Sequence, residues 1–271
     1  MKLVVKLSGK VLEDRALRLS IAHQVALLWT GGHRLLVVHG AGKQLTDLSR
    51  QLGIPVIQHQ GRRVTDDRTL DAAKMVFSAV NRDLVALLVS QGTPALGITA
   101  YDALLSKSIR RPPLRVADAE GVVREVDFGF VGEISEVNRE ALRRLVEAPY
   151  LPVICSLCAE ESGQVLNINA DTVATEFAIG LGADRLVSVS DVAGIYLDPK
   201  DPTTLISRLS AAEAREYLQQ GRFTEGMIPK VETALKAVEH GVTAVQIVSG
   251  IERDALVQAI EKDAGTLLTA Q

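Results

Sequence analysis

Hydrophobic positions along the chain follow two alternating periods. Short runs of consecutive aliphatic residues, typical of buried strands, are followed by longer stretches in which apolar residues recur every three to four positions, as in amphipathic helices. Residues 3–7 and 15–29 form the first such pair and residues 34–39 and 43–51 the second, with glycine-containing turns between strand and helix. This repetition predicts βαβ units and a mainly parallel sheet.

The rest of the chain continues this alternation with one interruption. Its longest periodic stretch, residues 67–91, predicts a long amphipathic helix. Short β patterns at residues 114–117 and 122–126, joined by Asp118-Ala119-Glu120-Gly121, predict a β-hairpin insertion, followed by short polar strands within residues 129–137. The other predicted elements are strands at residues 94–98, 151–155, 164–168, 185–189 and 244–248, and helices at residues 139–147, 170–181, 211–219 and 229–240.

These elements and the composition both favour an α/β architecture. We expect a three-layer αβα sandwich with a mainly parallel central sheet, formed by an N-terminal lobe of residues 1–168 and a C-terminal lobe of residues 169–271. The 271-residue chain is 47% hydrophobic but only 4% aromatic, with a formal net charge of −3, which argues against nucleic-acid binding. No apolar run is long enough to span a bilayer and no signal peptide is recognisable, so we expect no membrane partner and a cytoplasmic location.

The cysteines and histidines give little sign of metal chemistry. Cys155 and Cys158 form a C-x-x-C motif, but the chain has 2 cysteines in all, so no second pair completes a zinc site. In a continuing strand their spacing puts the side chains on opposite faces, and we interpret them as buried structural thiols. The histidines are scattered without ligand spacing. We therefore expect no metal bound by side chains alone.

Glycine-containing turns follow predicted strands at residues 8–9, 40–42 and 191–194. Because ligands of open α/β sheets bind at the carboxyl ends of strands, we expect these turns to converge on one crevice that suits an anion. The segment after residue 39 imitates the dinucleotide motif G-x-G-x-x-G, but Leu45 replaces the third glycine and no Walker loop is present. A dinucleotide-dependent dehydrogenase is therefore disfavoured.

Two lysines lie where an uncompensated charge would be unfavourable. Lys6 sits inside an aliphatic strand, so it needs an anion, an edge position or a paired aspartate. Lys230 would lie in the first turn of a helix, the wrong end for a favourable interaction with the helix dipole. A bound phosphate would compensate both charges.

Further polar residues add to this picture. Arg63 precedes the 67–91 helix and suits bidentate binding of a carboxylate. Asn167 and Asn169 alternate on one face of a predicted strand, and Asp171 lies near the start of the next helix. Taken singly, these are ordinary turn and helix-start residues. Together with the lysines they indicate phosphate donors, a carboxylate clamp and an orienting acid.

The motifs resemble, in order and over nearly the whole chain, those of the N-acetyl-L-glutamate kinase branch of the amino acid kinase family. The lysine and glycine motifs are typical of the whole family, whereas the GRRVTD and NINAD segments are typical of fewer of its branches. These two segments argue against the uridylate, carbamate and aspartate kinase branches. The matching segments are KLSGK, VVHGAG, GRRVTD, VNRDLVALL, DFGFVGEISEVN, LNINADTVA, VSDVAGIY and GMIPKVETAL.

The resemblance implies the amino acid kinase fold and phosphorylation of the γ-carboxylate of N-acetyl-L-glutamate by ATP, whose phosphates would hold most of the Mg²⁺ coordination. Lys6 and Lys230 would stabilise the transferring phosphoryl group, and Asp171 would orient both lysines. Such a transfer needs alignment and charge stabilisation rather than a general base. The implied substrate-binding residues are Gly40, Ala41, Gly42, Arg63 for the α-carboxylate and Asn167 for the acetamido end. The implied ATP-binding residues are Gly9, Lys10, Asp191, Val192, Ala193, Gly194, Ile195, Tyr196, Arg222, Phe223 and Thr224.

Two departures from the family pattern border the expected acyl pocket. Ala41 stands where three consecutive glycines are usual and disfavours a positive φ, and residues 97–103 replace a glycine-rich stretch. A kinase for N-acyl-aminoadipate or another N-acylglutamate is therefore the nearest alternative. A catalytically silent nucleotide sensor is another, although the retained lysines argue against it.

The resemblance also bears on assembly. Arginine-inhibited members carry an N-terminal helix that links dimers into a hexamer, whereas the first strand predicted here begins at Leu3. We expect an arginine-insensitive homodimer built on the 67–91 helix.

Overall fold

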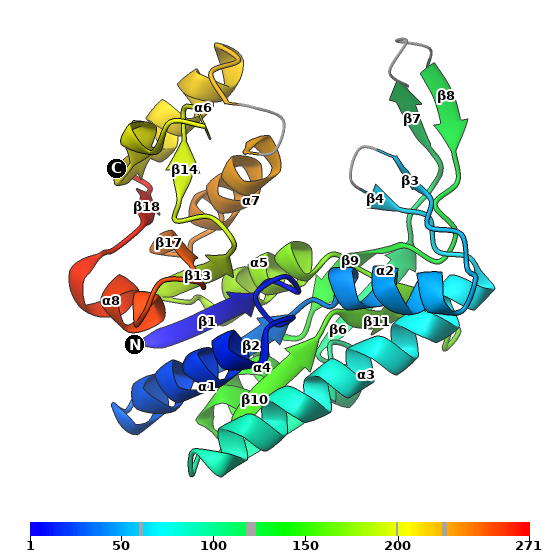
Figure 1. Cartoon of the computed structure of the whole chain (residues 1–271), viewed down its shortest axis with the longest axis horizontal. Helices are drawn as coiled ribbons and strands as arrows, with labels where there is room; N and C mark the ends of the chain where they lie inside the picture. The colour runs from blue at the N-terminus through cyan, green and yellow to red at the C-terminus, as the bar shows by residue number, and fades with distance from the viewer. Residues whose placement is uncertain (60–61, 118–122, 199, 224–226) are drawn as a thin grey trace.

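The core of the protein is one eight-stranded sheet, seen in a computed structural model that describes residues 1–59, 62–117, 123–198, 200–223 and 227–271 (Figure 1). Neighbouring strands are parallel except for the pair β17 and β18, which is antiparallel. The predicted mainly parallel sheet is therefore confirmed. In spatial order the strands are β16 (Arg208–Ser210), β18 (Thr266–Thr269), β17 (Ala244–Ser249), β13 (Arg185–Ser190), β1 (Lys2–Leu7), β2 (Arg34–His39), β10 (Leu151–Cys155) and β5 (Ala95–Thr99).

Helices cover both faces of this sheet and bury a separate apolar cluster on each side. Along β1, Leu3, Val5 and Leu7 enter one cluster and Val4 the other, as the two-residue period of a strand requires. No helix within the described ranges is long and apolar enough to cross a membrane. One face carries α1 (Arg15–Thr30), α2 (Gly42–Gln51), α3 (Asp67–Ser90) and α8 (Ala255–Lys262), and the other carries α4 (Arg139–Glu147), α5 (Ala170–Leu181), α6 (Ala211–Gln219) and α7 (Ile228–Glu239).

The two cysteines belong to the apolar clusters on opposite faces of the sheet. Both are buried and free, with Cys155 in the cluster below α3 and Cys158 in the cluster below α5. Burial raises the pKa of Cys155 to about 11 and that of Cys158 to about 12, so both stay protonated thiols at neutral pH. The prediction that both thiols are buried is confirmed.

Most helix boundaries agree with the sequence prediction because local capping signals define them. The 67–91 helix is α3, whose first turn is capped by Asp66 Oδ1 accepting from Thr69 N at 2.8 Å. The prediction ended at residue 248 and missed both α8 and β18. Helix α8 has no side-chain cap, and its N-cap residue Asp254 has φ of 59°, so the usual start signal is absent.

Short antiparallel pairs project from the sheet. The hairpin of β7 (Leu114–Ala117) and β8 (Val123–Val126) confirms the predicted insertion, while its predicted turn, residues 118–121, lies outside the described residues. In Figure 1 this hairpin rises beside the pair β3 and β4, opposite α6 and α7. The other pairs are β3 (Gln58–His59) with β4 (Arg62–Arg63), β6 (Ser106–Arg110) with β9 (Gly132–Val137), β11 (Leu157–Ala159) with β12 (Val165–Asn167), and β14 (Ile195–Tyr196) with β15 (Leu205–Ile206).

A turn after β5 holds two non-glycine residues in the left-handed region. Ala103 has φ of 52° and Leu104 of 56°, and both side chains are exposed. This conformation costs an L-residue with a Cβ about 1–2 kcal/mol, whereas glycine adopts it freely.

Ala103→Gly is therefore expected to raise the free energy of unfolding by about 0.5–1 kcal/mol, measured by urea titration. The matched control is Ala86→Gly at an exposed position inside α3, where glycine should lower stability by about 1 kcal/mol. A loss of stability at both positions would contradict the strain at Ala103.

Candidate active site

An ion pair below the carboxyl end of the central strands joins two of the candidate residues. Lys6 Nζ lies 2.8 Å from Asp171 Oδ1, and Lys6 is only 6% exposed. Strand β1 is central, so the edge position considered for Lys6 does not occur. Asp171 sits in the first turn of α5, where Asn169 Oδ1 accepts from its backbone N–H at 2.9 Å. Burial opposes ionisation of Asp171, but the charge and hydrogen bond of Lys6, helped by Lys230, hold its pKa below the usual value.

Lys230 approaches the same region from α7. Its Nζ donates to Ser190 Oγ at 3.0 Å, and Ser190 Oγ donates to Asp191 Oδ1 at 3.1 Å. Burial, reinforced by the charge of Lys6, lowers the pKa of Lys230 below its usual value. Asp171 and Asp191 compensate the charge of Lys230 only in part, so a further anion bound beside the two ammonium groups would be favourable.

The turn after β1 contacts two other turns. Lys10 Nζ lies 2.7 Å from Asp191 Oδ2, which ties it to the end of β13. Gln44 Nε2 donates to Gly9 O at 2.8 Å, and a Cβ on Gly9 would lie 3.1 Å from Gly42 N. A side chain at Gly9 would therefore push against the start of α2. The turns predicted to converge do so.

The segment after β2 offers only part of its backbone to a ligand. Gly40 N donates to Leu7 O at 3.2 Å, so this N–H is already used inside the sheet. Helix α2 begins at Gly42 without a side-chain cap, which leaves the N–H groups of its first turn open. Ala41 has φ of −147° and a buried methyl group, so alanine is accommodated here without the positive φ that would have disfavoured it.

Arg63 and Asn167 lie on the side of the N-terminal strands. Arg63 Nη2 donates to Gly42 O at 3.2 Å and contacts Thr46 Oγ1, while its buried Nη1 has no partner among the described residues. Burial, with the charge of Arg50, lowers the pKa of Arg63. Asn167 Nδ2 donates to Thr65 Oγ1 at 3.3 Å. An unpaired guanidinium nitrogen beside an uncapped helix start suits an anionic ligand.

One sequence expectation fails nearby. Asn169 does not share a strand face with Asn167, because β12 ends at Asn167 and Asn169 instead caps α5. Asn169 caps the helix instead of continuing the strand, because its side chain satisfies an open N–H group in the first turn of α5.

The candidate nucleotide turn is partly enclosed. Asp191, Val192, Ala193 and Tyr196 are half-exposed, whereas Gly194 and Ile195 are buried. A Cβ on Gly194 would lie 2.3 Å from Thr266 Oγ1, a group that also accepts from Ile195 N at 2.7 Å.

The second candidate nucleotide segment follows α6. The Arg222 guanidinium lies over the Tyr217 ring at 4.4 Å, and Phe223 is buried against the same ring. Only Arg222 of these two therefore presents its side chain to solvent. Thr224 lies outside the described residues.

The residues that sequence reasoning missed act through contacts with distant parts of the chain. Ser190, Gln44 and Thr46 each bond a candidate residue from another element. Their positions beside the glycine-containing turns could have marked them as site residues. Polar side chains are common next to turns, however, so this position alone does not single them out.

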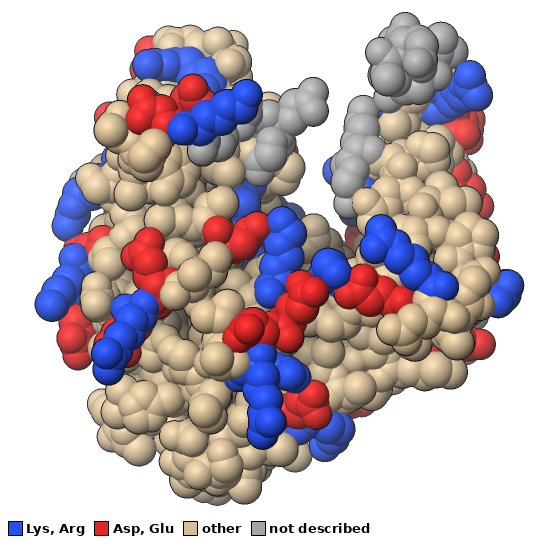
Figure 2. Space-filling model, in the orientation of Figure 1, with Lys and Arg blue, Asp and Glu red and all other residues tan. Residues whose placement is uncertain are grey.

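The surface around these residues is hollowed. Figure 2 shows a hollow between the arm of β3, β4, β7 and β8 and the C-terminal elements, with Lys, Arg, Asp and Glu side chains bordering it. In the part of the chain that the structure describes, no group of three or more His, Cys, Asp and Glu side chains could hold a metal ion.

Comparison with known proteins bears on this fold and site. The family model described as "Amino acid kinase family" matches residues 1–249. The chain belongs to the amino acid kinase family. An acetylglutamate kinase of Myxococcus xanthus is 39% identical over 97% of this chain and 86% of its own length, and one of Sorangium cellulosum is 43% identical over 92% and 87%. An N-acetylglutamate synthase from Neisseria gonorrhoeae, solved with coenzyme A and N-acetyl-glutamate, superposes with a TM-score of 0.84 at 26% identity. This amino acid kinase chain corresponds to 59% of the synthase.

Proposed function

We propose that this protein transfers the γ-phosphoryl group of ATP to the γ-carboxylate of N-acetyl-L-glutamate, giving N-acetyl-L-glutamyl 5-phosphate for arginine biosynthesis. The observation that carries the proposal is the Lys6–Asp171–Lys230 cluster at the carboxyl ends of β1 and β13, in a chain whose relatives named acetylglutamate kinase match it almost end to end. Two ammonium groups, one of them paired with Asp171 and the other bonded to Ser190, suit a phosphoryl group in transfer.

The acceptor would bind on the side of the N-terminal strands. Arg63, whose Nη1 has no partner among the described residues, would hold the α-carboxylate, and Asn167 would contact the acetamido end. The open N–H groups of Ala41 and the first turn of α2 would bind oxygens of the γ-carboxylate and the phosphoryl group. The acceptor is already a carboxylate nucleophile, so alignment rather than proton removal limits the step.

The donor would bind beside the C-terminal strands, along residues 191–196 with Gly9, Lys10 and Arg222. Mg²⁺ bound to ATP would neutralise part of the phosphate charge. Asp171 and Asp191 are each paired with a lysine, which suits a metal held mainly by the phosphates rather than by a carboxylate cage. Lys6 and Lys230 would take up the charge that develops on the transferring group.

The strand order supports a division of these tasks between two lobes. Residues 1–168 supply one half of the sheet, strands β1, β2, β10 and β5. Residues 169–271 supply the other half, strands β13, β17, β18 and β16. We assign acyl-amino-acid binding and dimerisation to the first lobe and ATP binding to the second. The cytoplasm is the proposed location.

The substrate assignment is tested by a panel of acceptors with ATP, using hydroxylamine to trap the acyl phosphate. N-acetyl-L-glutamate should support turnover, whereas N-acetyl-aminoadipate, other N-acylglutamates and free glutamate should be at least about tenfold poorer in kcat/KM. Activity with a different acyl acid would replace the substrate, and nucleotide binding without any turnover would favour the silent sensor.

We also propose a homodimer built on α3. This helix exposes Met75 and Val89, and the neighbouring edge strand β5 exposes Leu96, at 61%, 54% and 39% respectively. Apolar side chains on an open sheet edge are usually covered in the working protein. Light scattering coupled to gel filtration should give twice the 29.1 kDa chain mass, and Met75→Glu should shift it towards the monomer. A monomeric wild-type protein would refute the dimer.

A further inference from the structure

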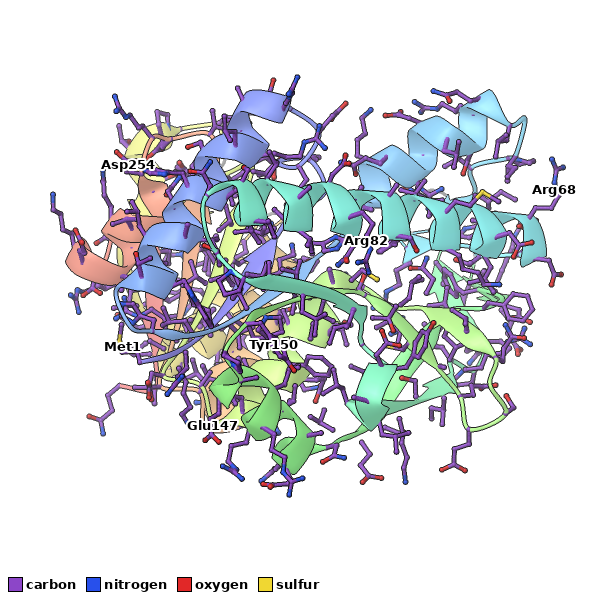
Figure 3. All side chains as sticks on the ribbon, turned by 90° about the horizontal axis from the view of Figure 1, so that it is seen from below. Met1, Arg68, Arg82, Glu147, Tyr150 and Asp254 are labelled. Carbon is purple, nitrogen blue, oxygen red and sulfur yellow. The ribbon has the colours of Figure 1, made fainter. Side chains whose placement is uncertain are left out.

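A buried histidine and a buried asparagine connect α3 to the segment that follows β2. His39 is the last residue of β2 and is 0% exposed, and Asn81 on α3 is 2% exposed. Asn81 Nδ2 lies 3.1 Å from His39 Nε2 and 3.0 Å from Val153 O. The next residue of α3, Arg82, is labelled in Figure 3, and its Nη2 donates to Gly97 O at 2.8 Å. Helix α3 is thus tied to β2, β10 and β5 through polar contacts.

The contact with β10 decides the protonation of His39. Val153 O can only accept a hydrogen bond, so the Asn81 amide nitrogen must face it. The same nitrogen therefore donates to His39 Nε2, which must be unprotonated. The proton of the neutral ring then lies on Nδ1, which donates to Gly40 O at 3.2 Å. Burial lowers the pKa of His39 to about 4, so the ring stays neutral at physiological pH.

The hydrogen bond to Gly40 O has a consequence for the next residue. In a planar trans peptide the carbonyl of Gly40 and the N–H of Ala41 point in opposite directions. The N–H of Gly40 is held by Leu7 O, so the protein holds Gly40 on both of its backbone polar groups. The direction of the Ala41 N–H therefore depends on His39.

We propose that His39 and Asn81 are positioning residues, which hold the Gly40 carbonyl and thereby direct the Ala41 N–H towards the reacting oxygens. This inference rests on the proposed kinase function. Neither side chain touches substrate, because both are buried behind the segment they orient.

Gly97 on β5 supplies the space for this arrangement. A Cβ at this position would lie 2.0 Å from Asn81 Oδ1 and 2.9 Å from Val85 Cγ2. Asn81 Oδ1 has no hydrogen-bond partner among the described residues, so the carboxamide is kept in place by its amide nitrogen and by close packing against Gly97. The glycine thus allows the one amide orientation that makes His39 Nε2 an acceptor.

The kinetic test compares two substitutions of His39 that differ in the donor they keep. His39→Asn retains an amide nitrogen at the place of Nδ1 but leaves a cavity, whereas His39→Phe fills the space without a donor. With N-acetyl-L-glutamate and ATP, His39→Phe should lower kcat by about 10–100-fold with little change in the KM for ATP, and His39→Asn should stay within about threefold of wild type. If His39 had a merely structural role, activity would follow stability. The cavity in His39→Asn should lower stability more than His39→Phe does, so His39→Asn would then be the less active variant.

The control is Gln24→Met, which removes another buried amide, one that accepts from Leu256 N at 2.8 Å far from this segment. It should lower stability and leave kcat unchanged. Equal kcat values for His39→Phe and His39→Asn would overturn the inference. A wild-type protein without turnover would instead refute the proposed function.

A second measurement stands apart from activity and from the folding of variants. Nitrogen-15 NMR of the imidazole ring in the unliganded wild-type protein at pH 7 should show a protonated Nδ1 and an unprotonated Nε2. A ring protonated on Nε2, or on both nitrogens, would overturn the inference even if the enzyme is active.

Discussion

Lys230→Met is expected to reduce kcat by about 10²–10³-fold while making the unliganded protein more stable. The loss of activity follows from removing one of the two ammonium groups proposed to stabilise the transferring phosphoryl group. The gain in stability follows from the lowered pKa of Lys230, which burial and Lys6 cause. Between this lowered pKa and that of an unfolded lysine, the unfolded chain binds more protons than the folded one. At neutral pH the charged Lys230 therefore carries an unfavourable free energy in the folded state, which methionine lacks.

Steady-state kinetics and urea unfolding of the same preparations test both halves of this prediction. Lys236→Met is the matched control on the same helix, because Lys236 is exposed and paired with Glu176 outside the site. It should leave kcat unchanged and alter stability by less than about 1 kcal/mol. Unchanged turnover in Lys230→Met would remove Lys230 from the mechanism, and a loss of stability would show that its charge is already compensated.

Asp171→Asn should impair both stability and turnover, because it leaves Lys6 buried without its counter-charge. Removing one partner of a fully buried pair costs about 3–5 kcal/mol, and we expect about 1–3 kcal/mol here since the Asp171 side chain is 37% exposed. Turnover should fall by about 10²-fold, because Lys6 loses the carboxylate that positions it. Glu176→Gln on the same helix breaks an ion pair away from the site and should leave turnover intact.

The double substitution Lys6→Met with Asp171→Asn separates the two effects of this pair. Methionine suits the aliphatic strand β1, so the double variant should recover most of the stability lost in Asp171→Asn. Its turnover should remain at or below that of the single variant. If Lys6→Met restores no stability, the ion pair is not the source of the loss, and if it restores turnover, Lys6 is not catalytic.

The layout of the fold was largely predictable because each βα unit carries its own signals. The runs at residues 3–7 and 34–39 are buried strands, and Asp66 starts α3 where a capping residue was available. Helix α8 and strand β18 were not found, because α8 lacks a capping side chain. Strand β18 takes its antiparallel place from pairing with β17, which local pattern does not encode.

The candidate site was predictable in its residue types more than in its contacts. A lysine inside an aliphatic strand and another at a helix start were unusual enough to mark Lys6 and Lys230. The assignment of Asn169 to a strand face was wrong, since capping of α5 takes precedence there. The sequence suggested a disfavoured positive φ at Ala41, but its φ is negative. Left-handed backbone strain lies instead at Ala103 and Leu104.

By itself the sequence determined the α/β class, the parallel strands and the presence of lysines that require an anion, because these depend on local periodicity and on the unfavourable burial of an unpaired charge. Only the tertiary structure decided which groups compensate one another. The pairs of Lys6 with Asp171 and Lys10 with Asp191 join residues 165 and 181 positions apart. The contact of Lys230 with Ser190 spans 40 positions. The tautomer of His39 depends in the same way on Asn81 and Val153 O. Such contacts arise where strand ends from separate βα units meet, and no local pattern records which side chains face each other there.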